Sequence, residues 1–204
     1  MDLKSHWNKI YKSKTPSELT WFQSEPSLSL KLIELSGIPK TSRVIDVGGG
    51  ASFLTKRLLE QGYARPAVLD ISGESISKAK SLVGDKAAEV EWYEADITRW
   101  QPPVKFDLWH DRAVFHFLTD EKDRHLYIDI LKQALAPDGY IIIATFAIAG
   151  PPKCSGLDVV RYDSRSIRAE LGNEFRLIET QNEMHLTPSC GKQKFSYFLI
   201  KRQT

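Results

Sequence analysis

The chain has 204 residues, of which 42% are hydrophobic and 26% charged, and its formal net charge is +2. This length suits a single domain with one substantial core, and the small net charge argues against a general nucleic-acid or membrane surface. The two cysteines, Cys154 and Cys190, have neither the number nor the spacing of a disulfide framework or a zinc site. We therefore expect a globular cytoplasmic protein with no signal peptide, membrane span or metal.

Residues 1–36 form the first segment that we distinguish, and we interpret them as a helical lid in front of a domain at 37–204. Aromatic side chains stand out in its polar stretch, and its last part has helical periodicity. The aromatic residues that we assign to the lid are Trp7, Tyr11, Trp21 and Phe22. Anchoring of an N-terminal helix to the core is an equally good reading of these aromatics.

From residue 37 onwards, short apolar runs alternate with segments of helical periodicity, which is typical of βαβ units around a parallel sheet. Strands are predicted at 43–47, 67–70, 89–94, 106–109, 140–146, 175–180 and 195–201. Helices are predicted at 28–35, 53–59, 75–82, 123–134 and 164–171. Because no helix fits between the last two strands, that pair must be antiparallel.

The most informative motif is the turn at 46–52, which joins the first strand to a helix and contains Gly48, Gly49 and Gly50. Glycines there let the backbone approach a ligand closely, at the sheet edge where α/β folds bind ligands. A dinucleotide fingerprint would need a third glycine where Phe53 stands, and no Walker lysine follows. The carboxylate of Asp46 favours a cationic ligand over a pyrophosphate. A tight turn without a ligand is the alternative.

Two further carboxylates follow strands at the same edge. Asp70 lies 20 positions after Gly50, where an acidic side chain can accept hydrogen bonds from the hydroxyl groups of a ribose. Asp96 follows the third strand and can accept a hydrogen bond from an adenine amino group, with Ile71 and Ile97 on either side of the base. The alternatives are a helix cap for Asp70 and a solvated loop residue for Asp96.

Together these motifs resemble those of the class I S-adenosylmethionine-dependent methyltransferases, including the small methyltransferase domains of types 11 and 12. The resemblance covers roughly residues 40–148. The matching motifs, in chain order, are Asp46-x-Gly48-x-Gly50, Asp70, Ala95-Asp96, Phe106-Asp107-Leu108 and Leu135-Ala136-Pro137-Asp138-Gly139-Tyr140. The chain departs from the usual pattern at Ser52, where the family has a glycine.

The resemblance implies an α/β fold, a Rossmann-like three-layer α/β/α sandwich. Its seven-stranded, mostly parallel sheet has one antiparallel strand and the order 3-2-1-4-5-7-6. It also implies S-adenosylmethionine as cofactor, S-adenosylhomocysteine as product, and methyl transfer to a small molecule or a protein side chain. An NAD(P)-dependent oxidoreductase and an inactive binding module on the same fold are the alternative functions. The residues expected to bind the cofactor are Asp46, Gly48, Gly49, Gly50, Asp70, Ile71, Asp96, Ile97 and His110.

Candidates for acceptor chemistry are fewer. His110 follows the fourth strand and is a candidate general base near neutral pH, and Asp111 is a candidate to orient it or to bind a cationic acceptor. The alternatives are a helix cap for Asp111 and a contact of His110 with the cofactor or the loop backbone. Arg161 and Tyr162, beyond the fifth strand, are candidates for the substrate wall, Arg161 for an anionic group. Nucleic-acid amino-methylating enzymes carry an Asn/Asp-Pro-Pro-aromatic motif at 110–113, which is absent here. We therefore expect no DNA partner. For the oligomeric state we expect either a monomer or a homodimer.

Overall fold

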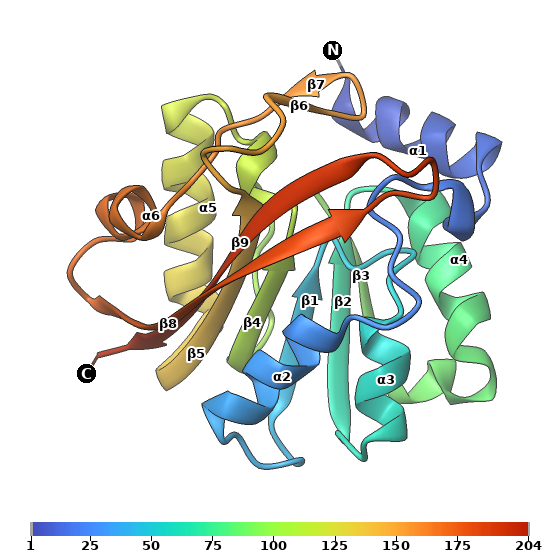
Figure 1. Ribbon diagram of the computed structural model, residues 1–204. Coiled ribbons are helices and arrows are strands. Elements are labelled where there is room, and N and C mark those ends of the chain that lie inside the picture. The colour runs from blue at the N-terminus through green and yellow to red at the C-terminus, as the bar shows by residue number, and fades with distance from the viewer. Residues whose placement is uncertain (1, 204) are drawn as a thin grey trace.

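The computed structural model describes residues 2–203 and is built around one seven-stranded sheet (Figure 1). The order is β3-β2-β1-β4-β5-β9-β8, and β9 runs antiparallel to both β5 and β8. The strands are β1 Arg43–Val47, β2 Arg65–Asp70, β3 Glu91–Glu94, β4 Phe106–Arg112, β5 Leu135–Phe146, β8 Phe175–Leu186 and β9 Lys192–Arg202. This confirms the predicted order, since β8 and β9 are the sixth and seventh strands of the main sheet.

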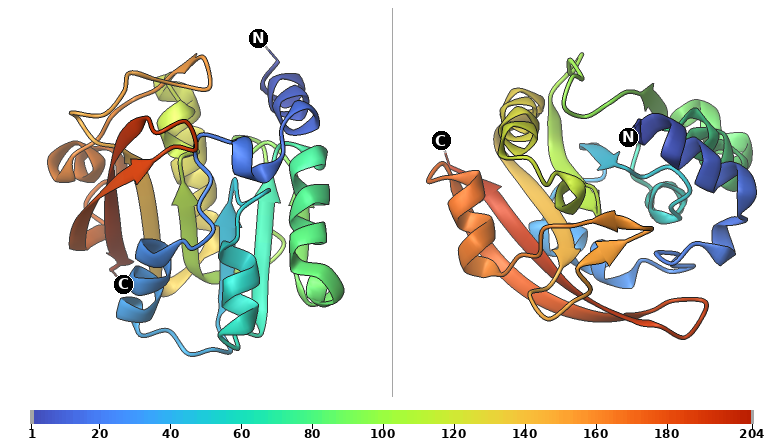
Figure 2. Two further views of the ribbon diagram at one scale, coloured as in Figure 1. Left: turned by 45° about the vertical axis from the view of Figure 1, so that its right-hand side comes forward. Right: turned by 90° about the horizontal axis from the view of Figure 1, so that it is seen from above.

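Helices cover both faces of the sheet, which confirms the three-layer sandwich (Figure 2). The α-helices are α1 Leu3–Ser13, α2 Ser27–Ser36, α3 Leu54–Glu60, α4 Gly73–Val83, α5 Glu121–Ala134 and α6 Ser164–Leu171. The 3₁₀ turns are η1 Pro16–Glu18, η2 Gly84–Glu89 and η3 Phe115–Phe117. Within residues 2–203, no helix has the length and apolar character needed to cross a membrane.

Alternation along the strands divides the core between the two faces. Val44 and Leu108 pack with α2 and α3 on one face, whereas Ile45 and Trp109 pack with α5 and α6 on the other. The helix α4 lies beside α3, near the cluster that contains Val68. Successive residues of β1 and β4 therefore point to opposite layers, which decides where the polar residues of the site are directed.

Two strands differ from their predicted bounds in ways that matter for the site. β4 continues through Arg112 instead of ending at Trp109, so the residues expected after the strand lie within it. β5 begins at Leu135, and its register against β4 shifts between Phe106 and Leu108. The motif residues Pro137, Asp138 and Gly139 lie at this irregularity inside β5, with Asp138 at a φ of 57°.

The terminal hairpin is much longer than predicted. β8 and β9 have 12 and 11 residues, and the hairpin curves towards the N-terminal segment (Figures 1 and 2). His185 Nε2 lies 2.8 Å from the carbonyl oxygen of Thr20, and Gln23 Nε2 donates to Glu183 at 2.9 Å. The segment between α1 and α2 is thus hydrogen-bonded to the hairpin.

The segment interpreted as a lid has two structural parts. α1 lies alongside α4 and places Leu3, Trp7 and Tyr11 on a cavity. α2 instead buries Leu32 and Ile33 in the core, on the face of the sheet that it shares with α3. Two short strands, β6 Lys153–Cys154 and β7 Leu157–Asp158, form a small second sheet for which no strands were predicted. This small sheet lies at the same edge of the main sheet as α1 (Figure 1).

Candidate functional site

The glycine turn between β1 and α3 holds the backbone in a conformation that side chains would obstruct. Gly48 has a φ of 69°, and its N–H donates to the Leu69 carbonyl at 2.6 Å. A Cβ on Gly48 would collide with Val114, and one on Gly49 would collide with the carboxylate of Asp46. The glycines therefore allow the turn to pack directly against the side chains of Val114 and Asp46.

Asp70, at the end of β2, is fixed by two backbone donors. Its Oδ1 accepts from Ser72 N at 2.8 Å and its Oδ2 from Gly50 N at 3.2 Å. The side chain lines a cavity of about 240 Å³. Burial raises the pKa of Asp70 to about 6. At neutral pH the carboxylate is therefore ionised and keeps free lone pairs for a ligand's hydroxyl groups.

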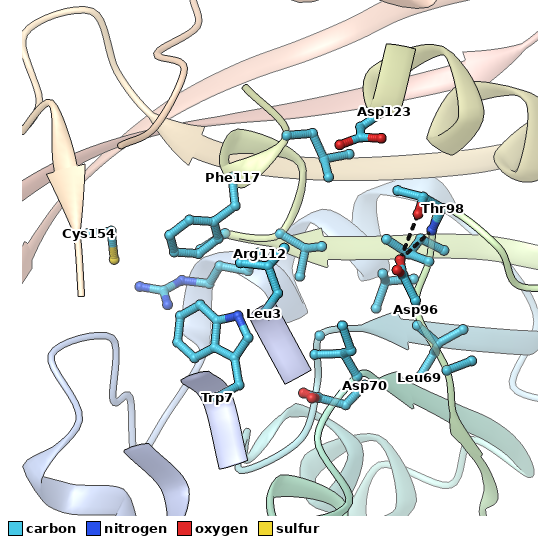
Figure 3. Close-up of a pocket in the computed structure, with 18 of the residues that line it drawn as sticks. Leu3, Trp7, Leu69, Asp70, Asp96, Thr98, Arg112, Phe117, Asp123 and Cys154 are labelled. Carbon is cyan, nitrogen blue, oxygen red and sulfur yellow. Dashed lines mark hydrogen bonds between the residues drawn. The ribbon is translucent and has the colours of Figure 1, made fainter. Parts of the chain in front are cut away.

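The other residues predicted for a nucleoside line the same cavity. Ile71, Asp96 and Ile97 all face it together with Gly48, and Figure 3 shows Asp70 and Asp96 near each other at one end. Asp96 Oδ1 accepts from the N–H and the hydroxyl of Thr98, at 2.9 and 2.8 Å. This end of the cavity thus combines two oriented carboxylates with apolar walls.

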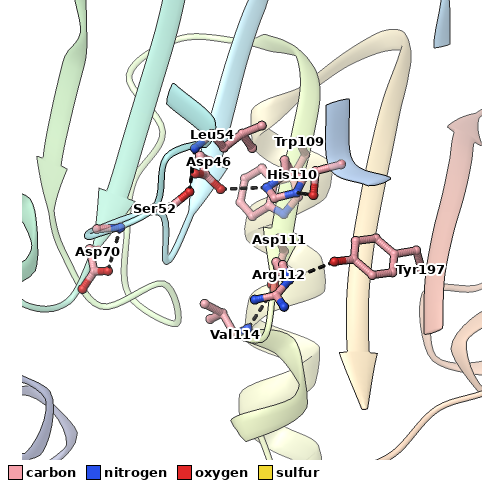
Figure 4. A network of polar contacts seen from close by, with 12 residues as sticks. Asp46, Ser52, Leu54, Asp70, Trp109, His110, Asp111, Arg112, Val114 and Tyr197 are labelled. Carbon is pink, nitrogen blue, oxygen red and sulfur yellow. Dashed lines mark hydrogen bonds and ion pairs between the residues drawn. The ribbon is translucent and has the colours of Figure 1, made fainter. Parts of the chain in front are cut away.

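Asp46 and His110 form a buried pair on the α2 side of the sheet (Figure 4). His110 Nδ1 lies 2.7 Å from Asp46 Oδ1, and His110 Nε2 lies 2.9 Å from the hydroxyl of Ser29. Both ring nitrogens are occupied, so His110 has none free to accept a proton from an acceptor in this conformation. Asp46 Oδ2 is buried without a hydrogen-bond partner.

Asp111 points to the opposite face from His110, because the two residues are consecutive in β4. It accepts from Tyr127 Oη at 2.6 Å and from Val114 N at 2.9 Å. Burial raises the pKa of Asp111 to about 6. The expectation that Asp111 orients His110 is corrected here: Asp46 contacts the imidazole, and Asp111 fastens the start of η3 to α5.

A smaller cavity, of about 50 Å³, lies on the other side of the glycine turn. Its walls include Asp46, Gly48, Gly49 and His110. Residues that it shares with the larger cavity are Tyr11, Trp21, Gly48 and Arg112. The two cavities are therefore neighbours separated by these shared side chains.

Three of the four predicted lid aromatics reach the larger cavity. Trp7, Tyr11 and Trp21 line it, and the ring centroid of Trp7 lies 5.6 Å from that of Trp21. Phe22 instead lines the smaller cavity, with its ring centroid 5.8 Å from that of Phe53. The N-terminal segment therefore supplies one wall of the site.

The two residues predicted for the substrate wall after β5 do not line either cavity. Arg161 is exposed and donates to the carbonyl oxygens of Ile148 and Gly150, at 3.0 and 3.3 Å. Tyr162 is 1% exposed, with its ring centroid 5.4 Å from that of Phe115 in the core. The chain turns inward at Tyr162 before α6, which directs this stretch away from the site.

Sequence reasoning missed four residues at the other end of the larger cavity, namely Arg112, Phe117, Cys154 and Phe195. They come from β4, η3, β6 and β9, which are far apart in the sequence. Arg112 had one usable signal, its place in the polar run after Trp109. Cys154 belongs to no motif in the sequence, yet it is 5% exposed and lines the cavity.

Known proteins with similar sequences and folds are methyltransferases. A sequence profile described as a methyltransferase domain matches residues 38–201. N-terminal Xaa-Pro-Lys N-methyltransferase 1 of Xenopus tropicalis is 32% identical over 120 residues, which are 55% of this chain and 52% of that protein. Malonyl-[acyl-carrier protein] O-methyltransferase 2 of Ilyobacter polytropus is 28% identical over 50% of this chain and 39% of that protein. The chain thus spans about half the length, or less, of these curated relatives.

Solved structures share the fold at low sequence identity. N-methyltransferase NodS from Bradyrhizobium japonicum, in complex with S-adenosylhomocysteine, has a TM-score of 0.73 at 16% identity and covers 97% of this chain and 98% of its own. The 1,6-didemethyltoxoflavin-N1-methyltransferase of Burkholderia thailandensis has a TM-score of 0.75 at 19% identity, with 99% and 88% covered. These similarities establish a common fold. The acceptors named for the other relatives differ, being an N-terminal Xaa-Pro-Lys, a malonyl-[acyl-carrier protein] and 1,6-didemethyltoxoflavin.

Proposed function

Because this chain belongs to the class I S-adenosylmethionine-dependent methyltransferases, we propose that it binds S-adenosylmethionine at the glycine turn and transfers its methyl group to an acceptor. The observation that carries the proposal is the larger cavity, where Asp70 and Asp96 lie at one end between apolar walls. A nucleoside offers hydroxyl and amino donors and a flat apolar base, which match these groups.

The polar groups around the glycine turn also fit a cationic nucleoside. Asp46 Oδ2 is buried and lacks a hydrogen-bond partner, and buried polar atoms of this kind call for a partner. An ammonium group of the cofactor's amino-acid chain would provide one. We assign Asp70 to the ribose, Asp96 to the adenine amino group, and Ile71 and Ile97 to the faces of the base. Gly48, Gly49 and Gly50 allow the close approach.

The chain's own residues act mainly by positioning. When bound, S-adenosylmethionine supplies an electrophilic methyl group that needs no metal or covalent intermediate. Trp7, Tyr11 and Trp21 close the cavity on the side of the N-terminus and exclude water. The remaining contribution is to hold the acceptor atom in line, which is an effect of orientation. Of residues 1–36, we propose that α1 and the chain as far as Trp21 serve as the lid, since α2 is buried in the core.

His110 and Asp111 were assigned catalytic roles from the sequence. We propose instead that His110 supports the cofactor site through Asp46, and that Asp111 supports η3 through Val114.

The acceptor is a small molecule or a protein group, and we place the enzyme in the cytoplasm, where its two free cysteines would stay reduced. The proposed reaction is compatible with either a monomer or a homodimer.

Calorimetry with S-adenosylhomocysteine, NAD and NADP tests the proposal. We expect one site per chain with micromolar affinity for S-adenosylhomocysteine and no heat with either nicotinamide nucleotide. Binding of NAD or NADP would favour an oxidoreductase instead. Binding of S-adenosylhomocysteine without methyl transfer to any extract fraction, assayed with a radiolabelled donor, would favour an inactive binding module.

A further inference from the structure

The larger cavity has two chemically different ends (Figure 3). Asp70, Asp96 and Asp123 lie towards one end, where the nucleoside is proposed to bind. Towards the other lie Trp7 and Phe117, beside the guanidinium of Arg112 and the thiol of Cys154. Phe195 also lines the cavity and adds a further aromatic wall. Its ring centroid lies 4.5 Å from the guanidinium carbon of Arg112. We call this second part the aromatic end.

Arg112 is largely buried and incompletely hydrogen-bonded. Its side chain is 10% exposed. Nε donates to Tyr197 Oη at 2.8 Å (Figure 4). Nη1 donates to the Trp21 carbonyl oxygen at 3.0 Å. Nη2 has no hydrogen-bond partner, since its distance of 3.7 Å to Glu183 Oε2 is too long for one. A buried guanidinium nitrogen in this state calls for a partner.

Glu183 meets that need only in part, because its Oε2 lies 3.7 Å from Nη2, within ion-pair range but too far for a hydrogen bond. Its Oε2 accepts from Tyr197 Oη at 2.9 Å, and its Oε1 accepts from Gln23 Nε2 at 2.9 Å. Glu183 therefore offsets part of the charge of Arg112 and fixes the positions of Tyr197 and Gln23. Because Arg112 lines both cavities, a carboxylate bound in the larger one would lie beside the positive charge of its guanidinium.

No carboxylate or imidazole faces the aromatic end among the described residues that line it. Its titratable groups are Arg112 and Cys154, and Tyr11 lies next to it, with its ring centroid 6.5 Å from that of Trp7. Burial raises the pKa of the Cys154 thiol, and burial together with the charge of Asp70 raises the pKa of the Tyr11 hydroxyl. Neither group is therefore an effective proton acceptor near neutral pH. A cationic acceptor would meet Arg112 without a free counter-charge, and a nucleophile that needs deprotonation would find no base.

From these observations we propose that the acceptor is a flat aromatic molecule carrying a carboxylate, held by Arg112 against the rings of the aromatic end. This inference rests on the proposed function, because it assumes that the cofactor fills the acidic end. The nucleophilic atom of this acceptor carries a free lone pair at neutral pH, so that methyl transfer proceeds without a general base. The site is thereby selective against the positively charged terminus of a peptide.

A charge series on the unaltered protein tests this directly. Benzoate, benzamide and benzylamine have similar rings but are anionic, neutral and cationic. Titrated by NMR into the protein saturated with S-adenosylhomocysteine, benzoate should bind at least tenfold more tightly than benzamide, and benzylamine more weakly still. Equal affinities, or tighter binding of benzylamine, would overturn the inference. If S-adenosylhomocysteine itself does not bind, the proposed function fails, which is a separate result.

The variant Arg112→Gln locates the effect. It should weaken benzoate binding about tenfold, leave benzamide binding unchanged and keep the affinity for S-adenosylhomocysteine within twofold. Arg112→Lys, which keeps the charge, should recover part of the benzoate affinity and guards against a folding defect. If Arg112→Gln instead loses S-adenosylhomocysteine affinity but binds 5′-methylthioadenosine normally, the guanidinium contacts the amino-acid chain of the cofactor, and the inference is wrong.

Discussion

Replacement of Asp70 by asparagine gives the most informative test of the cofactor site. The two side chains have nearly the same shape, but asparagine has one acceptor oxygen and no charge. Wild-type Asp70 already accepts from Gly50 N and Ser72 N, so its remaining lone pairs are those that would receive the ribose hydroxyl groups. The substitution therefore removes at least one charge-assisted hydrogen bond to the ligand.

The expected loss follows from the strength of such bonds. A hydrogen bond to a charged group contributes about 1.5–3 kcal/mol, and a loss of about 2 kcal/mol corresponds to a roughly 30-fold weaker affinity. Calorimetry with S-adenosylhomocysteine measures this change, and thermal unfolding confirms that the variant is folded. Glu74→Gln is a matched control, because Glu74 lies on α4 with its side chain 40% exposed and outside the cavity. A folded Asp70→Asn protein with wild-type affinity would refute the assignment.

Three more outcomes follow from the same contacts. Because burial raises the pKa of Asp70 to about 6, protonation below that pH should weaken S-adenosylhomocysteine binding about tenfold between pH 7 and pH 5; a flat calorimetric profile would argue against a role for the carboxylate. Gly48→Ala should lower the free energy of unfolding in urea by about 2 kcal/mol or more. Gly62→Ala, where φ is 84° and nothing lies within 4 Å of the added methyl, should have a smaller effect. His110→Leu should destabilise the fold by about 3 kcal/mol, because it leaves the buried Asp46 without its partner; unchanged stability with lost methyl transfer would instead favour a general base.

The end of the larger cavity that we propose for the nucleoside was accessible to sequence reasoning because its signals are local. Gly48 follows a strand directly, Asp70 ends the next strand, and parallel strands present their carboxyl ends at one edge. Ile71 and Ile97 are adjacent to the two carboxylates in the chain, so they reach the cavity together with them. These predictions needed only strand boundaries and spacing.

To predict where the side chains of His110 and Asp111 point, one must also know at which residue β4 ends. With the strand ended at Trp109 both residues belong to a loop, and either can face the other. With the strand continued to Arg112, alternation separates them, and His110 meets Asp46 and Ser29. The error was therefore one of strand length, which apolar patterning does not reveal when the last residues of a buried strand are polar.

The aromatic end was inaccessible for a different reason. Arg112 contacts Trp21 and Tyr197, which lie 91 and 85 positions away in the chain. Those contacts depend on the full length of the β8–β9 hairpin and on the path of the N-terminal segment. Neither follows from local propensity, since tertiary packing sets how far a hairpin extends.

The most direct test of the central claim is a calorimetric titration of the purified chain with S-adenosylhomocysteine at pH 7. The cavity with Asp70 and Asp96 at one end predicts one saturable site per chain with a micromolar dissociation constant. Absence of binding, in protein shown to be folded by its unfolding transition, would contradict the assignment of this cavity to S-adenosylmethionine.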